Sequence, residues 1–138
     1  MNQVEMHPYL QQEEMVAYGK ENDMLITAYS ALGSSDRPDT MKSDDEPALL
    51  ENKVIHSIAE KNDVTPAQVL IKWAVDRDTI VIPKSTNPGR IPENLQSADV
   101  ELDDDDHAKI KELNISYRYL DAVMLETESD MYRNIFDE

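Results

Sequence analysis

Short apolar segments alternate with helix-like segments along this sequence, and this alternation constrains the fold more than any other feature. Three short segments read as strands, at residues 4–6, 24–29 and 79–82, because they are apolar or β-branched and end at loop-forming residues. Since helical segments separate them, we predict an α/β fold built from parallel βαβ units. Strands that are apolar throughout are typical of a barrel or a doubly wound sheet, in which both faces are covered.

The clearest helix is predicted for residues 47–62, where apolar residues recur every three or four positions. A second helix follows at once, because Thr65 and Gln68 form a capping box and Pro66 occupies the first helical position. Residues 13–22 are predicted to form a further helix between the first two strands.

The last predicted helix, residues 103–113, opens with four consecutive aspartates from Asp103 to Asp106. This run lacks the alternating oxygen ligands and the glycine of a calcium loop. Carboxylates at a helix N-terminus are favoured by the helix dipole, so we predict no metal site here. His7 has no second histidine or acidic pair at metal-binding spacing, and we expect it to be structural.

The charge and the residue types exclude several classes of function. The sequence has 29 Asp and Glu against 13 Lys and Arg, for a net charge of −16. Such a surface repels nucleic acid and anionic membranes, so neither is expected as a partner. The absence of Cys excludes disulfides and a cysteine nucleophile. No membrane-spanning run or signal peptide is recognisable, which predicts a cytoplasmic protein. An acidic protein-interaction module remains an alternative.

Two loops follow predicted strands at their carboxyl ends, where ligands bind in parallel α/β folds. In residues 84–94, Lys84 and Arg90 flank hydroxyl groups at a strand-to-helix turn, which is a combination suited to phosphate. Two ordinary surface cations beside a turn are the alternative. Residues 30–38 offer small residues whose amides could approach a pyrophosphate, or they form a plain surface loop. Tyr29 could stack on a planar ring or be a buried core tyrosine.

Three motifs along the chain follow a known pattern. They are Asn-Gln-Val-Glu-Met-His-Pro-Tyr-Leu at residues 2–10, Thr-Ala-Tyr-Ser-Ala-Leu-Gly-Ser at 27–34, and Ile-Pro-Lys-Ser at 82–85 with Arg90, Glu93 and Asn94. In their order and spacing these motifs resemble the aldo-keto reductases. The resemblance extends over about residues 2–120 and implies part of a (β/α)8 TIM barrel. Residues 1–120 would contain its last three βα units, and residues 121–138 the tail and substrate-loop region.

The resemblance implies an enzyme that reduces aldehydes or ketones with NAD(P)H, and by matching position it assigns cofactor contacts to this chain. A pair of cations suited to a monoester phosphate favours NADP(H) over NAD(H). The implied contacts are Gln3 to the nicotinamide amide, Tyr29 to the nicotinamide ring, Ser30, Leu32, Ser34 and Asp36 to the pyrophosphate, Lys84, Ser85 and Arg90 to the 2′-phosphate, and Glu93 and Asn94 to the adenine.

The sequence also departs from the family pattern. Pro92 is unexpected in the adenine-side helix and is predicted to delay or kink it. The family's catalytic Asp, Tyr, Lys and His lie on the first four strands, which match no part of this chain, and His7 matches a non-catalytic position. We therefore expect no catalytic residue here and no reductase turnover by the chain alone.

The chain length agrees with this interpretation. A barrel of this kind needs on the order of 250 residues, so 138 residues correspond to roughly half of one. The chain would then supply the cofactor-binding half of a reductase that acts on a small carbonyl compound. A non-catalytic nucleotide-binding fragment is the alternative. An open barrel edge exposes backbone groups and apolar side chains, which predicts self-association.

Overall fold

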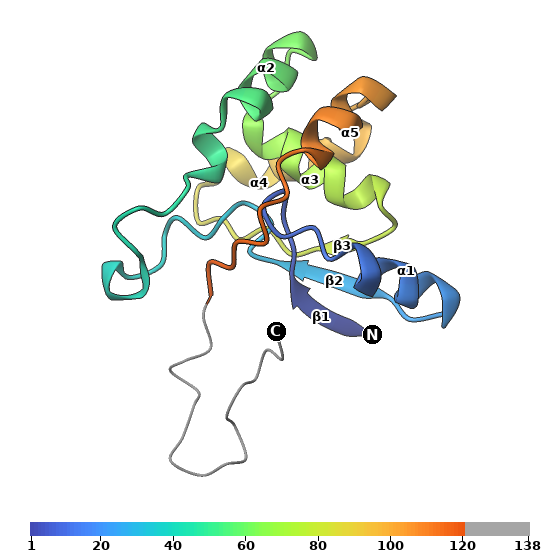
Figure 1. The fold of residues 1–138 in the computed structure, drawn as a ribbon. Helices are drawn as coiled ribbons and strands as arrows, with labels where there is room; N and C mark the ends of the chain where they lie inside the picture. The colour runs from blue at the N-terminus through green and yellow to red at the C-terminus, as the bar shows by residue number, and fades with distance from the viewer. Residues whose placement is uncertain (121–138) are drawn as a thin grey trace, which may run out of the picture.

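The strands form one parallel sheet in the computed structural model, which describes residues 1–120 (Figure 1). They are β1 (Asn2–Glu5), β2 (Ile26–Tyr29) and β3 (Ile80–Val81), in that order across the sheet. β1 and β3 both pair in parallel with β2. The predicted α/β class and parallel arrangement are confirmed, and the carboxyl ends of the strands therefore meet at one edge.

Five α-helices connect and follow the strands in the described part of the chain. Figure 1 shows α2, α3, α4 and α5 gathered on one side of the sheet. The longest, α3, has 11 residues, so no helix within residues 1–120 is long and apolar enough to cross a bilayer. Their bounds are α1 (Glu13–Glu21), α2 (Lys53–Lys61), α3 (Pro66–Asp76), α4 (Arg90–Gln96) and α5 (Asp104–Lys111).

Sequence periodicity predicts a helix over residues 47–62, and this prediction is wrong for the residues before Lys53. The chain makes a short 3-10 turn at Leu49–Glu51, and then Asn52 adopts an extended conformation before α2 begins. The Asn52 side chain accepts hydrogen bonds from the amides of Val54, at 2.8 Å, and Ile55, at 3.3 Å. Asparagine competes for backbone donors in this way, which makes it a good N-cap and a poor interior residue.

Capping boxes fix the N-terminal starts of two helices, α3 and α5. At α3, the Thr65 hydroxyl accepts from the Gln68 amide and the Gln68 side chain accepts from the Thr65 amide, as predicted. At α5, Asp103 and Asp106 make the same reciprocal pair of hydrogen bonds. Reciprocal caps satisfy amides that lack helical partners and thereby fix where each helix begins.

The core lies between one face of the sheet and the helices. Ala28 of β2 and Met6, the residue after β1, pack there with Ile58, Leu70 and Trp73, and all are buried. Residues alternate between the two faces of a strand, so the odd-numbered positions of β1 and β2 point to the opposite face. Those positions include two of the predicted site residues.

The expectation that the strands are covered on both faces is wrong for β3. Ile80 and Ile82 are 41% and 51% exposed, whereas Ile26, Thr27 and Ala28 of β2 are buried. Side chains of a strand point to the two faces of the sheet, and within residues 1–120 no element packs over these two isoleucines. In this part of the chain β3 is also an edge strand of two residues, hydrogen-bonded to β2 alone.

Gly19 allows α1 to approach β2 more closely than any side chain would permit. A Cβ atom at this position would lie 2.8 Å from the Met24 carbonyl oxygen and 2.9 Å from Ile26 Cγ1. We expect Gly19→Ala to lower the free energy of unfolding by about 1–3 kcal/mol, because this clash outweighs the higher helix propensity of alanine. Urea denaturation measures the change.

Gly89→Ala is the matched control, since the nearest atom to an added Cβ there is Asn87 Oδ1 at 3.3 Å. This variant should stay within about 0.5 kcal/mol of the wild type. A Gly19→Ala protein as stable as the wild type would show that the helix can move away from the strand without cost.

Candidate functional site

The loops that follow β2 and β3 line one open cavity of about 380 Å³ at the carboxyl edge of the sheet. Two stretches separated by more than forty positions in the sequence meet here because their strands are neighbours. The site residues predicted from sequence that line the cavity are Ser30, Leu32, Ser34 and Asp36 from the first loop and Lys84, Ser85 and Arg90 from the second.

The first loop is held in a tight turn. Gly33 has a φ of +88°, and a Cβ atom there would lie 3.1 Å from Leu49 Cβ, so both the conformation and the space favour glycine. The Gly33 amide donates to the Ser30 carbonyl oxygen at 2.8 Å. The Ser34 hydroxyl donates to the Ser30 hydroxyl at 2.7 Å. The turn thus holds two hydroxyl groups together on the cavity wall.

The second loop is shaped by its own polar side chains. The Ser85 hydroxyl accepts from the Asn87 amide at 3.1 Å, and the Asn87 side chain accepts from the Gly89 amide at 2.8 Å. Helix α4 then begins at Arg90, with Pro92 as its third residue. An amide in the first helical turn has no partner within the helix, so proline fits there. Asn87-Pro88 is typical of a helix start, and Pro92 is predicted to delay or kink the helix; the structure shows the delay, with α4 beginning at Arg90.

An ion pair joins the two loops. Lys84 Nζ lies 2.7 Å from Asp36 Oδ2, and the hydrogen bond from Lys84 lowers the pKa of Asp36. Both side chains are about two-thirds exposed, at 68% and 67%, so the pair contributes at most about 1 kcal/mol. Within residues 1–120, Arg90 has no ion-pair partner. An anion entering the cavity would therefore meet one uncompensated cation and a second that can exchange its partner.

Gln3 and Tyr29 are not among the residues that line the cavity. Gln3 is exposed on β1, and Tyr29 is half-buried at the end of β2. Both are on the sheet face opposite Val4 and Ala28, which pack toward the helices. Burial and the nearby Glu5 carboxylate raise the pKa of Tyr29, although Arg118 opposes this shift.

Glu93 and Asn94 also lie outside that lining. The Glu93 carboxylate accepts from the Thr65 hydroxyl at 2.9 Å, and its carbonyl oxygen accepts from the Gln68 side chain at 3.3 Å. Glu93 therefore fastens α4 to the start of α3. Asn94 lines a second, apolar groove of about 620 Å³ between α3 and α4, which also contains Lys84 and Ser85.

Glu5 and His7, at the end of β1, form a fully buried pair that the sequence analysis did not recognise. His7 Nε2 lies 3.0 Å from Glu5 Oε1, and both residues are 0% exposed. The Glu5 carboxylate also accepts from the amides of Tyr119, at 2.6 Å, and Leu120, at 3.1 Å. Burial raises the pKa of Glu5, but these hydrogen bonds outweigh it and leave the pKa below its ordinary value. The signal in the sequence was an acid two residues before a histidine, on one strand face.

Arg37 is a second buried group that the sequence did not reveal. Its guanidinium donates to the Met41 carbonyl oxygen at 3.0 Å and to the Ser34 carbonyl oxygen at 3.1 Å, and it forms an ion pair with Glu46. It also lies over the Tyr119 ring, 5.2 Å from the ring centre. A single side chain thus organises the loop that forms one wall of the cavity.

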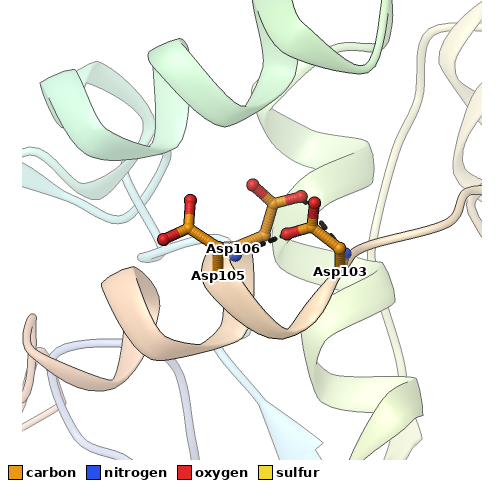
Figure 2. Close-up of side chains that lie close together, drawn as sticks. All are labelled: Asp103, Asp105 and Asp106. Atoms are coloured by element: carbon orange, nitrogen blue, oxygen red, sulfur yellow. Dashed lines mark hydrogen bonds between the residues drawn. The ribbon is translucent and has the colours of Figure 1, made fainter.

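Figure 2 shows the aspartate cluster at the start of α5, where the carboxylates of Asp103, Asp105 and Asp106 approach within 4.8 Å. Lys61 of α2 lies between two of them, 2.6 Å from Asp103 and 2.8 Å from Asp106. Hydrogen bonds to Asp103 and Asp106 raise the pKa of Lys61 to about 12. Asp105 pairs with Lys109 at 2.6 Å. The cluster is therefore compensated by the chain's own cations and joins α2 to α5.

Comparison with known proteins places this geometry in context. The sequence model of the aldo/keto reductase family matches residues 1–115. The chain is 44% identical, over its whole length, to the aldo/keto reductase slr0942 of Synechocystis, of which it covers 43%. It is 45% identical over 86% of its length to the mouse aldo-keto reductase family 1 member A1, and 44% to the chicken protein of that name. The chain spans less than half the length of these relatives.

The compensation of the aspartate cluster by Lys61 can be tested with added metal. Because the ammonium group already contacts Asp103 and Asp106, we expect millimolar CaCl2 or MgCl2 to leave the wild-type melting temperature unchanged. Lys61→Met should lower the melting temperature by several degrees, since it leaves the buried Asp106 carboxylate short of a cation. Differential scanning calorimetry measures both effects.

Lys109→Met is the control, because it removes a cation from the exposed Asp105 and should change the melting temperature little. A rise in the wild-type melting temperature with calcium would contradict the structural role of the cluster.

Proposed function

Because the chain belongs to the aldo/keto reductase family, we propose that its cavity holds NADP(H) and that it provides the cofactor-binding part of an oxidoreductase for small carbonyl compounds. Members of this family generally use a nicotinamide cofactor, which would supply the hydride. The (β/α)8 barrel is the family's fold, and a parallel sheet flanked by helices fits part of one. The observation that carries the proposal is the convergence of seven matched residues on a single cavity.

The second loop supports binding of a phosphate monoester. Arg90 and Lys84 provide two cations, and Ser85, which lies between them in the sequence, also lines the cavity. A dianionic monoester forms stronger hydrogen bonds with such groups than a ribose hydroxyl does. The 2′-phosphate distinguishes NADP(H) from NAD(H), so these three residues would determine the preference.

The first loop supports binding of the pyrophosphate. Ser30 and Ser34 present hydroxyl groups on a wall of small residues, which lets the chain approach the ligand closely. Asp36 would repel the pyrophosphate if its charge were uncompensated, but Lys84 lies 2.7 Å away. We infer that Asp36 holds Lys84 in place between the two phosphate groups, in addition to lining the cavity.

The remaining matched residues would contact the two ends of the cofactor. Gln3 has an amide that can pair with the nicotinamide amide, and the Tyr29 ring lies on the same sheet face, where it could stack on the nicotinamide. At the other end, Asn94 would contact the adenine. Glu93 would also contact the adenine. Its carboxylate accepts a hydrogen bond from Thr65, which it would either keep or replace by a hydrogen bond from the adenine.

Nucleotide binding without turnover is a second candidate function. It is favoured because the residues of this chain match the family's cofactor positions and none matches the family's catalytic positions. In that case the chain would retain affinity for the nucleotide and leave the carbonyl compound unreduced.

Fluorescence titration with NADPH and NADH tests the cofactor assignment. We expect Arg90→Ala to weaken NADPH binding about tenfold or more and to change NADH binding less than about twofold, because only NADPH carries the 2′-phosphate. Lys53→Ala is the matched control, since it removes the same charge from an exposed site on α2 outside the cavity. It should leave both affinities unchanged.

Equal losses for NADPH and NADH in Arg90→Ala would contradict the 2′-phosphate assignment, and no NADPH binding by the wild type would contradict the cofactor site. An assay with a simple aldehyde and NADPH tests the second candidate function. We expect no turnover at an enzyme-like rate from this chain alone, and turnover at such a rate would exclude the second candidate.

We also propose that the chain self-associates through an open-edge patch, defined as Ile80, Ile82, Ile91 and Leu95. The side chains of these residues are 41–78% exposed. They belong to β3, to the residue after it and to α4, which borders the apolar groove of about 620 Å³. Within residues 1–120, the edge of β3 that faces away from β2 has no paired strand. Unpaired strand edges and exposed apolar groups favour association, whereas the net charge of −16 opposes it.

Light scattering measures this association. The average mass should exceed that of one chain and rise with salt, because screening weakens the charge repulsion. The double variant Ile82→Lys/Leu95→Lys should reduce the mass, while Ile115→Lys, at another exposed isoleucine, should not. A wild-type monomer at high salt would contradict the proposal.

A further inference from the structure

We propose that Glu5 is a positioning residue for the nucleotide site. In this proposal, its carboxylate docks residues 117–120, and the docked segment holds the first cavity loop in its binding conformation. Glu5 itself is not part of the cavity lining. The effect on nucleotide affinity rests on the proposed function, whereas the docking of the segment does not.

The first link is the carboxylate itself. Glu5 is fully buried and receives the amides of Tyr119, at 2.6 Å, and Leu120, at 3.1 Å, on different oxygens. His7 fixes the first of those oxygens from the other side, at 3.0 Å. Two consecutive amides on one buried carboxylate are charge-assisted hydrogen bonds, so releasing the segment would leave a buried charge short of partners.

The second link is the Tyr119 side chain. Its ring is 4% exposed and lies between the docked backbone and the first cavity loop. The ring lies 3.4 Å from the position of a Cβ on Gly33, so the Gly33 turn packs against it. Its hydroxyl donates to the carbonyl oxygen of Pro47, which lies further along residues 30–52, the segment that joins β2 to α2. Docking by Glu5 therefore places the ring against two points of this segment, Gly33 and Pro47.

The third link is Arg37, which lies over the Tyr119 ring at 5.2 Å. The same guanidinium donates to the carbonyl oxygens of Ser34 and Met41 and pairs with Glu46. Ser34 and Asp36, which precede Arg37 in the sequence, line the cavity. The path from Glu5 to the cavity is thus a continuous series of contacts, and each contact can be removed singly.

If Glu5 acts on the cavity through these contacts, release of residues 117–120 should remove loop contacts and lower nucleotide affinity. If the segment is released, the loop loses the ring against Gly33 and the cation–π contact that orients Arg37. The segment between β2 and α2 contains only two short 3-10 turns, Asp39–Met41 and Leu49–Glu51, and would sample more conformations. Nucleotide affinity would fall by the fraction of molecules that are no longer in the binding conformation.

Trypsin reports the docking directly, because it cleaves after Arg118 and the next amide, that of Tyr119, is held by Glu5. We expect Glu5→Gln to raise the initial cleavage rate at the Arg118–Tyr119 bond about tenfold, measured by mass spectrometry. Asp106→Asn is the matched control: it alters another fully buried carboxylate, which contacts Lys61 and Asn62 and not this segment. It should raise that rate less than about twofold.

NADPH titration reports the coupling to the cavity. Glu5→Gln and Arg37→Met should each weaken NADPH binding about fivefold to tenfold. The double variant should lose less than the product of the two single losses, because both residues act on the same loop, Glu5 through Tyr119 and Arg37 through Tyr119 and its own contacts to Ser34 and Met41. Asp106→Asn should leave the affinity unchanged. In NMR spectra, NADPH should shift the Tyr119 amide signal in the wild type and fail to do so in Arg37→Met.

Each outcome has one meaning. Unchanged cleavage at Arg118 in folded Glu5→Gln, or cleavage raised equally by Asp106→Asn, would overturn the docking role. Additive losses of NADPH affinity in the double variant would overturn the coupling. If the wild type bound no NADPH, the proposed function would fail, while the trypsin comparison would still test whether Glu5 docks the segment.

Discussion

Parallel pairing of β2 with both of its neighbours is the constraint on which the rest of the structure depends. Parallel strands end at the same edge, so the loops after β1, β2 and β3 converge there although helices separate them in the sequence. The ion pair between Asp36 and Lys84, 48 positions apart, is a direct result of that convergence. Helices α2 and α3 fix the spacing of the two loops, because they form the crossover between β2 and β3.

Local signals predicted the parts of the fold that local interactions determine. The capping box of Thr65 and Gln68 and the aspartates that open α5 each fix a helix start within a few residues, and both helices lie where the sequence places them. Periodicity failed at Asn52, because apolar spacing continues through a residue whose side chain takes over the backbone amides of the next turn. The apolar composition of residues 79–82 misled in another way, because exposure there depends on whether another element covers the face of the strand.

The candidate site was predictable only in part. Matched motifs identified both loops, and the structure brings seven of their residues together around one cavity. Nothing local to Glu93 indicates that it bonds Thr65, because the two belong to different helices and lie 28 positions apart. Arg37 and Glu5 escaped notice for the same reason: a charged residue in a loop or a short strand is normally solvated, and only the tertiary structure shows that it is buried.

The charge pattern shows how so acidic a chain keeps a cation available for a ligand. Lys61 is shared by two aspartates, Arg37 is enclosed by carbonyl groups and Glu46, and Lys84 is paired with an exposed acid. These arrangements differ in how easily an anion could compete, because exposed pairs are weak and buried ones are costly to break. Arg90, at the start of α4, is the cation for which an anion could compete most easily, because it has no ion-pair partner in residues 1–120. The buried Arg37 therefore organises a loop that forms one wall of the cavity, whereas the exposed Arg90, and Lys84 after it exchanges its partner, can bind an anion there.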